Sequence, residues 1–489
     1  MKNKKYYFFL GLIFAIGFLI RILFSLNQPF WLDEKYSVFF ATQFSSSELL
    51  INFSNDANPG LYYIFVKYLL KITTNIFNLR LITSIIPQIF GAYILTKALK
   101  NKKESLLLST LILINPFFIE LSWQLRGYSL SMLVASISYF LIIKLKEKYS
   151  KKILVSLIML LIIGNMIHYA MYLFSFFTCV YLIYDWKNKS LILKTGILFI
   201  VSLSLLSQFF IQNNNISNYK SQFTEVSWIS KPNITNIPTV YLFSFGMLTN
   251  KQLYNYNQPN IGIIAIEYIL LISILIFIKN KKNISTILFL IPYLSILGIS
   301  IVIPFLSKSV FFTDIIPDIS IFIPRIHIPF IIIFWITITK IFLKKFEKIK
   351  KRSEIIYKIV FINLIIYLLH VNFINYSQVN NDFIERQNNL NLIKNNYQIF
   401  SKKTHIWPHW ILIEAIDLNN LSEIDNIKNL KKSSKESEKN FYLEDKKMDI
   451  TEFQIFTYDP IMSNKKTIQE HCETKENIGS FSKLNCNKF

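Results

Sequence analysis

The sequence is poor in glycine, cysteine and acidic residues. It has 11 glycines and 3 cysteines in 489 residues, and no glycine-rich loop of the kind that cradles a nucleotide phosphate. The cysteines, Cys179, Cys472 and Cys486, do not have the spacing of a metal site. If the tail of the chain is exported, Cys472 and Cys486 can form a disulfide.

The abundant residues are apolar. Hydrophobic residues make up 52% of the sequence and aromatic residues 16%, in repeated long runs, which predicts a polytopic membrane protein. The net charge of +23 comes from short Lys and Arg clusters between these runs. Such clusters orient membrane helices, so we expect no nucleic-acid partner.

The apolar runs predict an all-α bundle of about eleven membrane-spanning helices, since a span needs roughly 20 residues. No small-residue cleavage site follows the first run, so we expect that run to stay as a helix. The predicted spans are Tyr6 to Leu26, Leu79 to Leu99, Ser105 to Leu121, Tyr128 to Leu145, Lys152 to Gly164, Tyr169 to Tyr184, Leu191 to Ile211, Ile261 to Ile278, Ile284 to Leu306, Pro324 to Ile341 and Ile355 to Ile374.

Every second connection between the spans is basic, and the positive-inside rule places these connections in the cytoplasm. The other connections then face the exterior. Frequent Ile, Asn and Lys indicate an AT-rich bacterial genome, and hence the bacterial inner membrane. The basic groups are Lys2/Lys4/Lys5, Lys100/Lys102/Lys103, Lys144/Lys146/Lys148/Lys151/Lys152, Lys187/Lys189/Lys194, Lys279/Lys281/Lys282 and the run from Lys340 to Arg352.

The external segments are unequal in length. The first, Asn27 to Asn78, is long and half apolar, and we predict short interfacial helices in it, one opened by a Ser45 to Glu48 capping box and one over 61–70. From about Asn375 the chain turns polar. We therefore divide it into a membrane domain, 1–374, and a small external domain, 375–489, either fully folded or partly disordered.

Unusual polar residues gather on the predicted external side. An acidic pair, Asp33 and Glu34, directly follows the first apolar run, which suggests chemistry at the membrane surface. Each has a simpler explanation. The acidic pair can belong to a solvated loop, Arg126 and Arg325 can extend from the membrane interface toward water, and His168 can be a packing residue. The other residues of this set are Asp56, Arg126, His168 and Arg325.

These residues lie in five ordered stretches: Leu32-Asp-Glu-Lys-Tyr36, Asp56-Ala-Asn-Pro-Gly-Leu-Tyr-Tyr63, Gln124-Leu-Arg-Gly-Tyr128, His168-Tyr169 and Pro324-Arg-Ile-His-Ile-Pro329. The set resembles the membrane glycosyltransferases of the GT-C fold, in the branch with the protein O-mannosyltransferases and the lipid A aminoarabinose transferase. The chain departs from that pattern in Asn58-Pro-Gly60, where the family usually has two prolines. It also has Ile326 where the family usually has Tyr.

The resemblance implies a GT-C bundle and an inverting transfer of a sugar from a polyprenyl phosphate to an acceptor hydroxyl or amine at the external face. Asp33 matches the catalytic carboxylate of the family, which takes the acceptor proton as general base. Glu34, about 100° away around a helix, is then an orienting or metal-contacting residue. The sugar, the acceptor (protein, lipid or glycan) and the oligomeric state are left open.

The departing lipid phosphate needs fixed cations, and Arg126, Arg325 and Lys35 are the candidates. Arg325 opens its span, so the helix dipole would add to its charge. Asp56 and His168 are candidates for binding either the sugar hydroxyls or a divalent cation, with Glu34 as a further metal candidate. Tyr63 and Tyr128 suit the sugar face or the membrane interface.

Three other functions compete with this interpretation. A polymerase or ligase of oligosaccharides carried on a polyprenyl diphosphate would place its key Arg and His residues in later loops. A secondary transporter would show repeated halves and broken helices, whereas we find no repeat and no acidic residue deep in a span. A membrane scaffold would not need Asp, Arg and His on one side.

Overall fold

The computed structural model describes residues 3–28, 30–51, 58–185, 196, 198–204, 206–207, 236–248, 267, 271, 295–297, 324–347, 351–377, 404–407, 452–458, 472–478 and 481–487. The chain divides into two compact units, which we treat separately. The first unit contains Met1–Leu26, Ser46–Ile64 and Arg80–Ser377, and the second contains Asn27–Ser45, Phe65–Leu79 and Gln378–Phe489. The predicted boundary at residue 375 stays a prediction.

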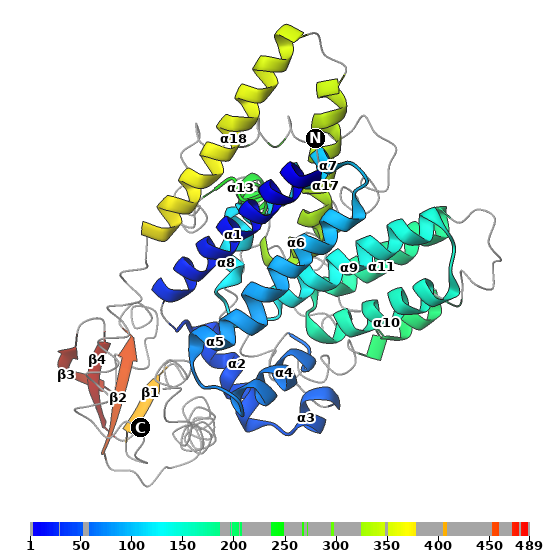
Figure 1. Ribbon diagram of the computed structural model, residues 1–489. Helices are drawn as coiled ribbons and strands as arrows, with labels where there is room; N and C mark the ends of the chain where they lie inside the picture. Colours follow the sequence, from blue (N-terminus) through cyan, green and yellow to red (C-terminus); the bar gives the residue numbers. More distant parts are fainter. Residues whose placement is uncertain are drawn as a thin grey trace. The chain divides into compact units, whose positions relative to one another are not determined.

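Long apolar helices form most of the first unit (Figure 1). Within the described residues, three helices are long and apolar enough to cross a membrane, or four if one bent pair counts as a single span. The protein is therefore a helical membrane protein, while the number eleven stays a prediction. The predicted spans at 191–211, 261–278 and 284–306 lie largely outside the described residues.

Seven of the eight remaining predicted spans coincide with helices of the structure. No proline interrupts α9, and Lys144 and Lys146 lie in its last turn, where positive charge favours the negative end of the helix dipole. The helices are α1 (Asn3–Asn27), α5 (Ile76–Arg80) continued by the π-helix η1 (Leu81–Ile85) and α6 (Ile86–Ala98), α9 (Tyr128–Glu147), α10 (Lys151–Ile167), α11 (Ala170–Asp185), α17 (Ile328–Glu347) and α18 (Lys351–Ser377).

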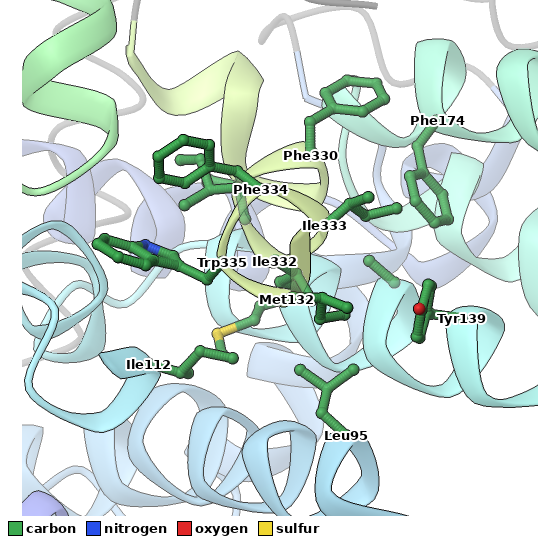
Figure 2. Packing of buried hydrophobic residues seen from close by; sticks show 14 of the residues in the cluster. Leu95, Ile112, Met132, Tyr139, Phe174, Phe330, Ile332, Ile333, Phe334 and Trp335 are labelled. Atoms are coloured by element: carbon green, nitrogen blue, oxygen red, sulfur yellow. The ribbon is translucent and has the colours of Figure 1, made fainter. Parts of the chain in front are cut away.

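The helix α17 lies at the centre of the core. Its first turns are apolar on every face, and the residues from Ile328 to Ile336 are buried. Figure 2 shows Phe330, Ile333, Phe334 and Trp335 of this helix packed among side chains of neighbouring helices, such as Phe174. A helix that is apolar all round is either enclosed by other helices or faces lipid, and the first turns of this one are enclosed.

The third predicted span, Ser105 to Leu121, is not one straight helix. It consists of α7 (Lys102–Leu113) and α8 (Pro116–Ser122), which meet at an angle of 58°. Pro116 has no N–H to continue α7, and the side chain of Asn115 accepts a hydrogen bond from the N–H of Phe118 as the N-cap of α8. The Asn-Pro pair is visible in the sequence, and the predicted span is bent at this pair.

Side chains from distant helices satisfy the carbonyl groups at this break. Arg21 of α1 donates to the carbonyl oxygen of Leu113 at 2.7 Å, and Asn372 of α18 donates to that of Ile114 at 2.7 Å. Asn115 itself donates to the carbonyl oxygen of Phe245, which follows α13 (Asn236–Ser244). Since lipid offers no hydrogen bonds, the contacts to Leu113 and Ile114 are the kind that a broken helix needs within a membrane.

The segment Asn27 to Asn78 contains three short helices, α2 (Leu32–Gln43), α3 (Ser46–Ile51) and α4 (Leu61–Leu70). The predicted helices at Ser45 to Glu48 and at 61–70 are confirmed as helices, and α2 is additional. In the second unit, the ammonium group of Lys67 donates to the carbonyl oxygens of Ala41 and Phe44, which lie at the end of α2. These two bonds give donors to carbonyl groups at the C-terminal end of α2, where the helix itself provides none.

The tail contains a four-stranded sheet with the order β1-β2-β4-β3. The all-α class therefore holds for the helical part of the chain, and the tail adds a small sheet that we did not predict. Its polar composition hid short alternating segments such as Glu452 to Tyr458, in which Phe453 and Ile455 alternate with polar residues. The strands are β1 (Thr404–Trp407), β2 (Glu452–Tyr458), β3 (Cys472–Ile478) and β4 (Phe481–Asn487); β1 runs parallel to β2, and the other pairs are antiparallel.

Candidate active site

Three of the predicted motifs meet inside the first unit. The guanidinium group of Arg126 donates from Nη1 to the phenol oxygen of Tyr63 at 2.9 Å, although the two residues are 63 positions apart. Tyr63 is fully buried and Arg126 is only 8% exposed. The ring of Tyr128 packs edge-on against that of His168, with 5.0 Å between the ring centroids. Residues that we selected from the sequence alone therefore form one buried group.

The loop that carries Arg126 is held from both sides. It connects α8 to α9, and the hydroxyl of Ser84 in the π-helix η1 donates to the carbonyl oxygen of Gln124 at 2.7 Å. A π-helix shifts side chains out of the regular α-helical pattern, and such segments are frequent at functional sites. A Cβ atom on Gly127 would lie 3.0 Å from the carbonyl oxygen of Ile167, so glycine lets the loop pack closely on the end of α10.

His168 is fully buried at the end of α10, with its ring also stacked on Tyr169 at 4.3 Å. Its Nδ1 atom accepts a hydrogen bond from the N–H of Ala170 at 3.1 Å. In a neutral imidazole with Nδ1 as acceptor, Nε2 carries the proton and is a donor. Of the two roles left open for His168, this geometry favours a hydrogen bond to an oxygen atom over a metal bond.

The acidic pair lies in the first turn of α2, in the second unit. Oε2 of Glu34 accepts a hydrogen bond from the N–H of Trp31 at 3.0 Å, which is the N3-to-N-cap contact of a capping box. This contact is local to the start of α2, and the two roles predicted for Glu34 stay predictions. Asp33 is half-buried beside it, and its carboxylate is stabilised by the positive end of the helix dipole.

The predicted cations have different environments. Lys35 is buried in the second unit, with its ammonium group 5.5 Å from the centre of the Phe30 ring. Arg325 lies in the 3-10 helix η4 (Pro324–His327) immediately before α17, so it opens a helix as predicted. Its side chain lies outside the described residues, and so does Asp56. Within the part of the chain that the structure describes, no three His, Cys, Asp or Glu residues form a metal-binding group.

Arg80 is a buried cation that the sequence analysis did not select. Its Nη1 atom donates to the carbonyl oxygen of Ser25 at 2.8 Å, and its guanidinium group lies 5.5 Å from the centre of the Trp123 ring. Trp123 begins the loop that carries Arg126. Its position near the end of the predicted span Leu79 to Leu99 could have drawn attention to it. A charged residue in a membrane span is costly, so its presence indicates a specific role.

Glu267 is an acidic residue deep in a predicted span, where we expected none. This residue lies well inside the predicted span Ile261 to Ile278 and is 6% exposed. Its Oε2 atom accepts a hydrogen bond from the hydroxyl of Thr239 in α13 at 2.7 Å. The absence of intramembrane carboxylates is therefore no longer an argument against a transporter.

Neighbouring aromatic residues connect α13 to the last motif. The ring of Tyr241 lies 5.3 Å from that of His327, which follows Arg325 by two residues and is fully buried.

No protein-family model matches the sequence, and no curated protein matches it either.

Proposed function

We propose that this protein is an inverting glycosyltransferase that moves a sugar from a polyprenyl phosphate to an acceptor at the external face of a bacterial inner membrane. The observation that carries the proposal is the buried group of Arg126, Tyr63, Tyr128 and His168. These residues come from three motifs that the resemblance selected before their positions were known. A cation, aromatic rings and a histidine N–H are the groups that bind a phosphorylated sugar.

The proposed reaction needs one base and at least one fixed cation. Asp33 takes the proton of the acceptor hydroxyl or amine while the acceptor atom bonds to the anomeric carbon. The bond from that carbon to the phosphate oxygen breaks, and its electron pair stays on the polyprenyl phosphate. The acceptor attacks from the face opposite the leaving phosphate, which inverts the anomeric centre.

Arg126 is well suited to bind the developing phosphate charge. Its Nη1 atom donates to the phenol oxygen of Tyr63, and this hydrogen bond orients the guanidinium group. A donor that is already oriented and shielded from water stabilises a developing anion without reorganisation. Arg325, at the start of α17, is the second proposed phosphate ligand and is aided by the helix N-terminus.

Two rivals are separated from this proposal by their products. An oligosaccharide polymerase or ligase would release a polyprenyl diphosphate, whereas the proposed enzyme releases a monophosphate. A transporter would move its substrate without forming a glycosidic bond. The buried Glu267 fits the transporter better than the sequence analysis allowed, so transport is measured in the same preparations.

The first experiment compares membrane glycolipids and glycoproteins of a deletion strain with those of the parent by mass spectrometry. We expect one class of molecule to lose a sugar in the deletion strain, and re-expression of the protein to restore it. Expression of Asp33→Asn should not restore it, whereas Glu48→Gln, which changes an exposed external carboxylate on α3, should restore it fully. Full restoration by Asp33→Asn would exclude Asp33 as the base.

The orientation is tested separately by cysteine labelling of intact cells. Cysteines placed at Ser46 and Ser217 should react with an impermeant thiol reagent, and one at Ser150 in a basic connection should not. Labelling at Ser150 without labelling at Ser46 would reverse the orientation and exclude an external active site.

A further inference from the structure

The strands β3 and β4 place two cysteines directly opposite each other. In this antiparallel pair, Cys472 is the register partner of Cys486. Directly opposed residues on antiparallel strands have Cα atoms about 4.5–5.5 Å apart and project from the same face of the sheet. Disulfides join residues whose Cα atoms are about 4.4–6.8 Å apart, so the register satisfies this requirement.

The register depends on a bulge between the cysteines and the turn. On the turn side, Ile478 pairs with Phe481 and Glu476 pairs with Lys483. The pairing then shifts between Thr474 and Glu476, which leaves Lys475 as the extra residue. If the turn-side register continued unchanged, Cys472 would face Asn487. The bulge therefore brings the two cysteines into register.

The predicted topology places this hairpin in an oxidising compartment. The basic run from Lys340 to Arg352 precedes α18 and is expected in the cytoplasm. Because α18 is a predicted span that ends at Ser377, the tail that follows it is expected outside. Structural disulfides form and persist in exported segments and are rare in the cytoplasm.

We propose that Cys472 and Cys486 form a disulfide that joins β3 to β4 in the exported tail. The two thiols lose two protons and two electrons to an exported thiol–disulfide oxidoreductase, whose own disulfide is reduced to two thiols. The inference rests on the proposed orientation of the membrane domain and not on sugar transfer. It gives the tail a covalent link across the hairpin.

The test uses the full-length protein in intact cells. Free thiols are alkylated near neutral pH with a membrane-permeant reagent, without prior reduction, and the peptides are identified by mass spectrometry. We expect a linked peptide pair that contains Cys472 and Cys486, and we expect Cys179 to be alkylated only after denaturation because it is buried. Alkylation of both Cys472 and Cys486 in most molecules would overturn the proposal.

Two variants test the role of the bulge. Deletion of Lys475 should move Cys472 out of register and lower the linked fraction several-fold, whereas Lys475→Ala keeps the residue count and should leave the fraction unchanged. An equal linked fraction after the deletion would overturn the register on which the proposal rests. The measurement needs no enzymatic activity, so absence of sugar transfer with a linked pair would reject only the proposed function.

Discussion

The first unit contains two buried arginines whose surroundings differ. Arg21 is fully buried, and its guanidinium group donates to the carbonyl oxygens of Gly17 and Leu113 and to the side chain of Gln88. Arg126 lies in a connection between two helices and is bound by the phenol of Tyr63. Arg21 thus satisfies the backbone of a broken helix, whereas Arg126 is an oriented cation among predicted substrate-binding residues.

This difference shows that burial alone does not identify a functional arginine. Both residues carry the cost of a buried charge, and only the partners distinguish them. Carbonyl partners at the break between α7 and α8 give Arg21 a role in the fold. The hydrogen bond to Tyr63 orients the guanidinium group of Arg126, which suits the binding of an anionic ligand. Variants of the two sites should therefore separate stability from activity.

The largest effect is expected for Arg126→Ala. Loss of a cation that stabilises the developing phosphate charge should lower the transfer rate by roughly 10²–10³-fold, and Arg126→Lys should recover part of it because one charge is kept. The rate is measured with purified enzyme, and the unfolding temperature of each variant is the control for folding. An unchanged rate in Arg126→Ala would remove Arg126 from the phosphate site.

For Arg21→Leu we expect lower stability and an unchanged rate of transfer. The carbonyl of Leu113 and the side chain of Gln88 lose their donor, and each buried group left without a partner costs about 1–3 kcal/mol. The free energy of unfolding in detergent should fall, while the rate per folded molecule stays near that of the wild type. A large loss of rate in fully folded Arg21→Leu would contradict a structural role.

A glycine pair tests the helix break itself. Gly246 has a φ of 77°, and an added Cβ would lie 2.6 Å from Nδ2 of Asn115, so Gly246→Ala should lower stability by about 1–2 kcal/mol. Gly11→Ala is the control, because nothing lies within 4 Å of an added Cβ there and alanine favours a helix. Equal stability of the two variants would show that the contact between Asn115 and Gly246 is not close.

The smallest effect is expected for Tyr63→Phe. The variant removes the phenol that orients Arg126 but keeps the ring and the cation, so the rate should fall by roughly tenfold, about 1.4 kcal/mol in the barrier. Tyr68→Phe is the matched control, since Tyr68 is 53% exposed on the same helix. If both variants keep the full rate, Tyr63 does not position Arg126 for catalysis.

Sequence reasoning succeeded where a local pattern determines structure. Long apolar runs gave the helices around α9, α17 and α18, and the capping pattern at Ser45 to Glu48 gave α3. It failed where partners distant in sequence decide the outcome. The break after α7 is possible because Arg21 and Asn372 reach its carbonyl groups, which no local window can show.

The same distinction applies to the candidate site. The motifs supplied Arg126, His168 and Tyr128 in advance because their residue types are unusual beside membrane spans. Arg80 was missed because it was counted as the edge of a span, and Glu267 because it was read as part of an apolar run. The contact between Arg126 and Tyr63 was not predictable, since it depends on how α4 packs against a loop 63 residues away.

The proposed function is tested most directly by measuring what the protein does with a defined sugar donor. A polyprenyl monophosphate sugar, labelled in the sugar, is added to the purified protein together with membranes of the deletion strain as the source of acceptor. The account predicts that wild-type protein transfers the label and releases polyprenyl monophosphate, and that Asp33→Asn does so at least about 10²-fold more slowly. Transfer only from a polyprenyl diphosphate donor, or equal rates for wild type and Asp33→Asn, would contradict it.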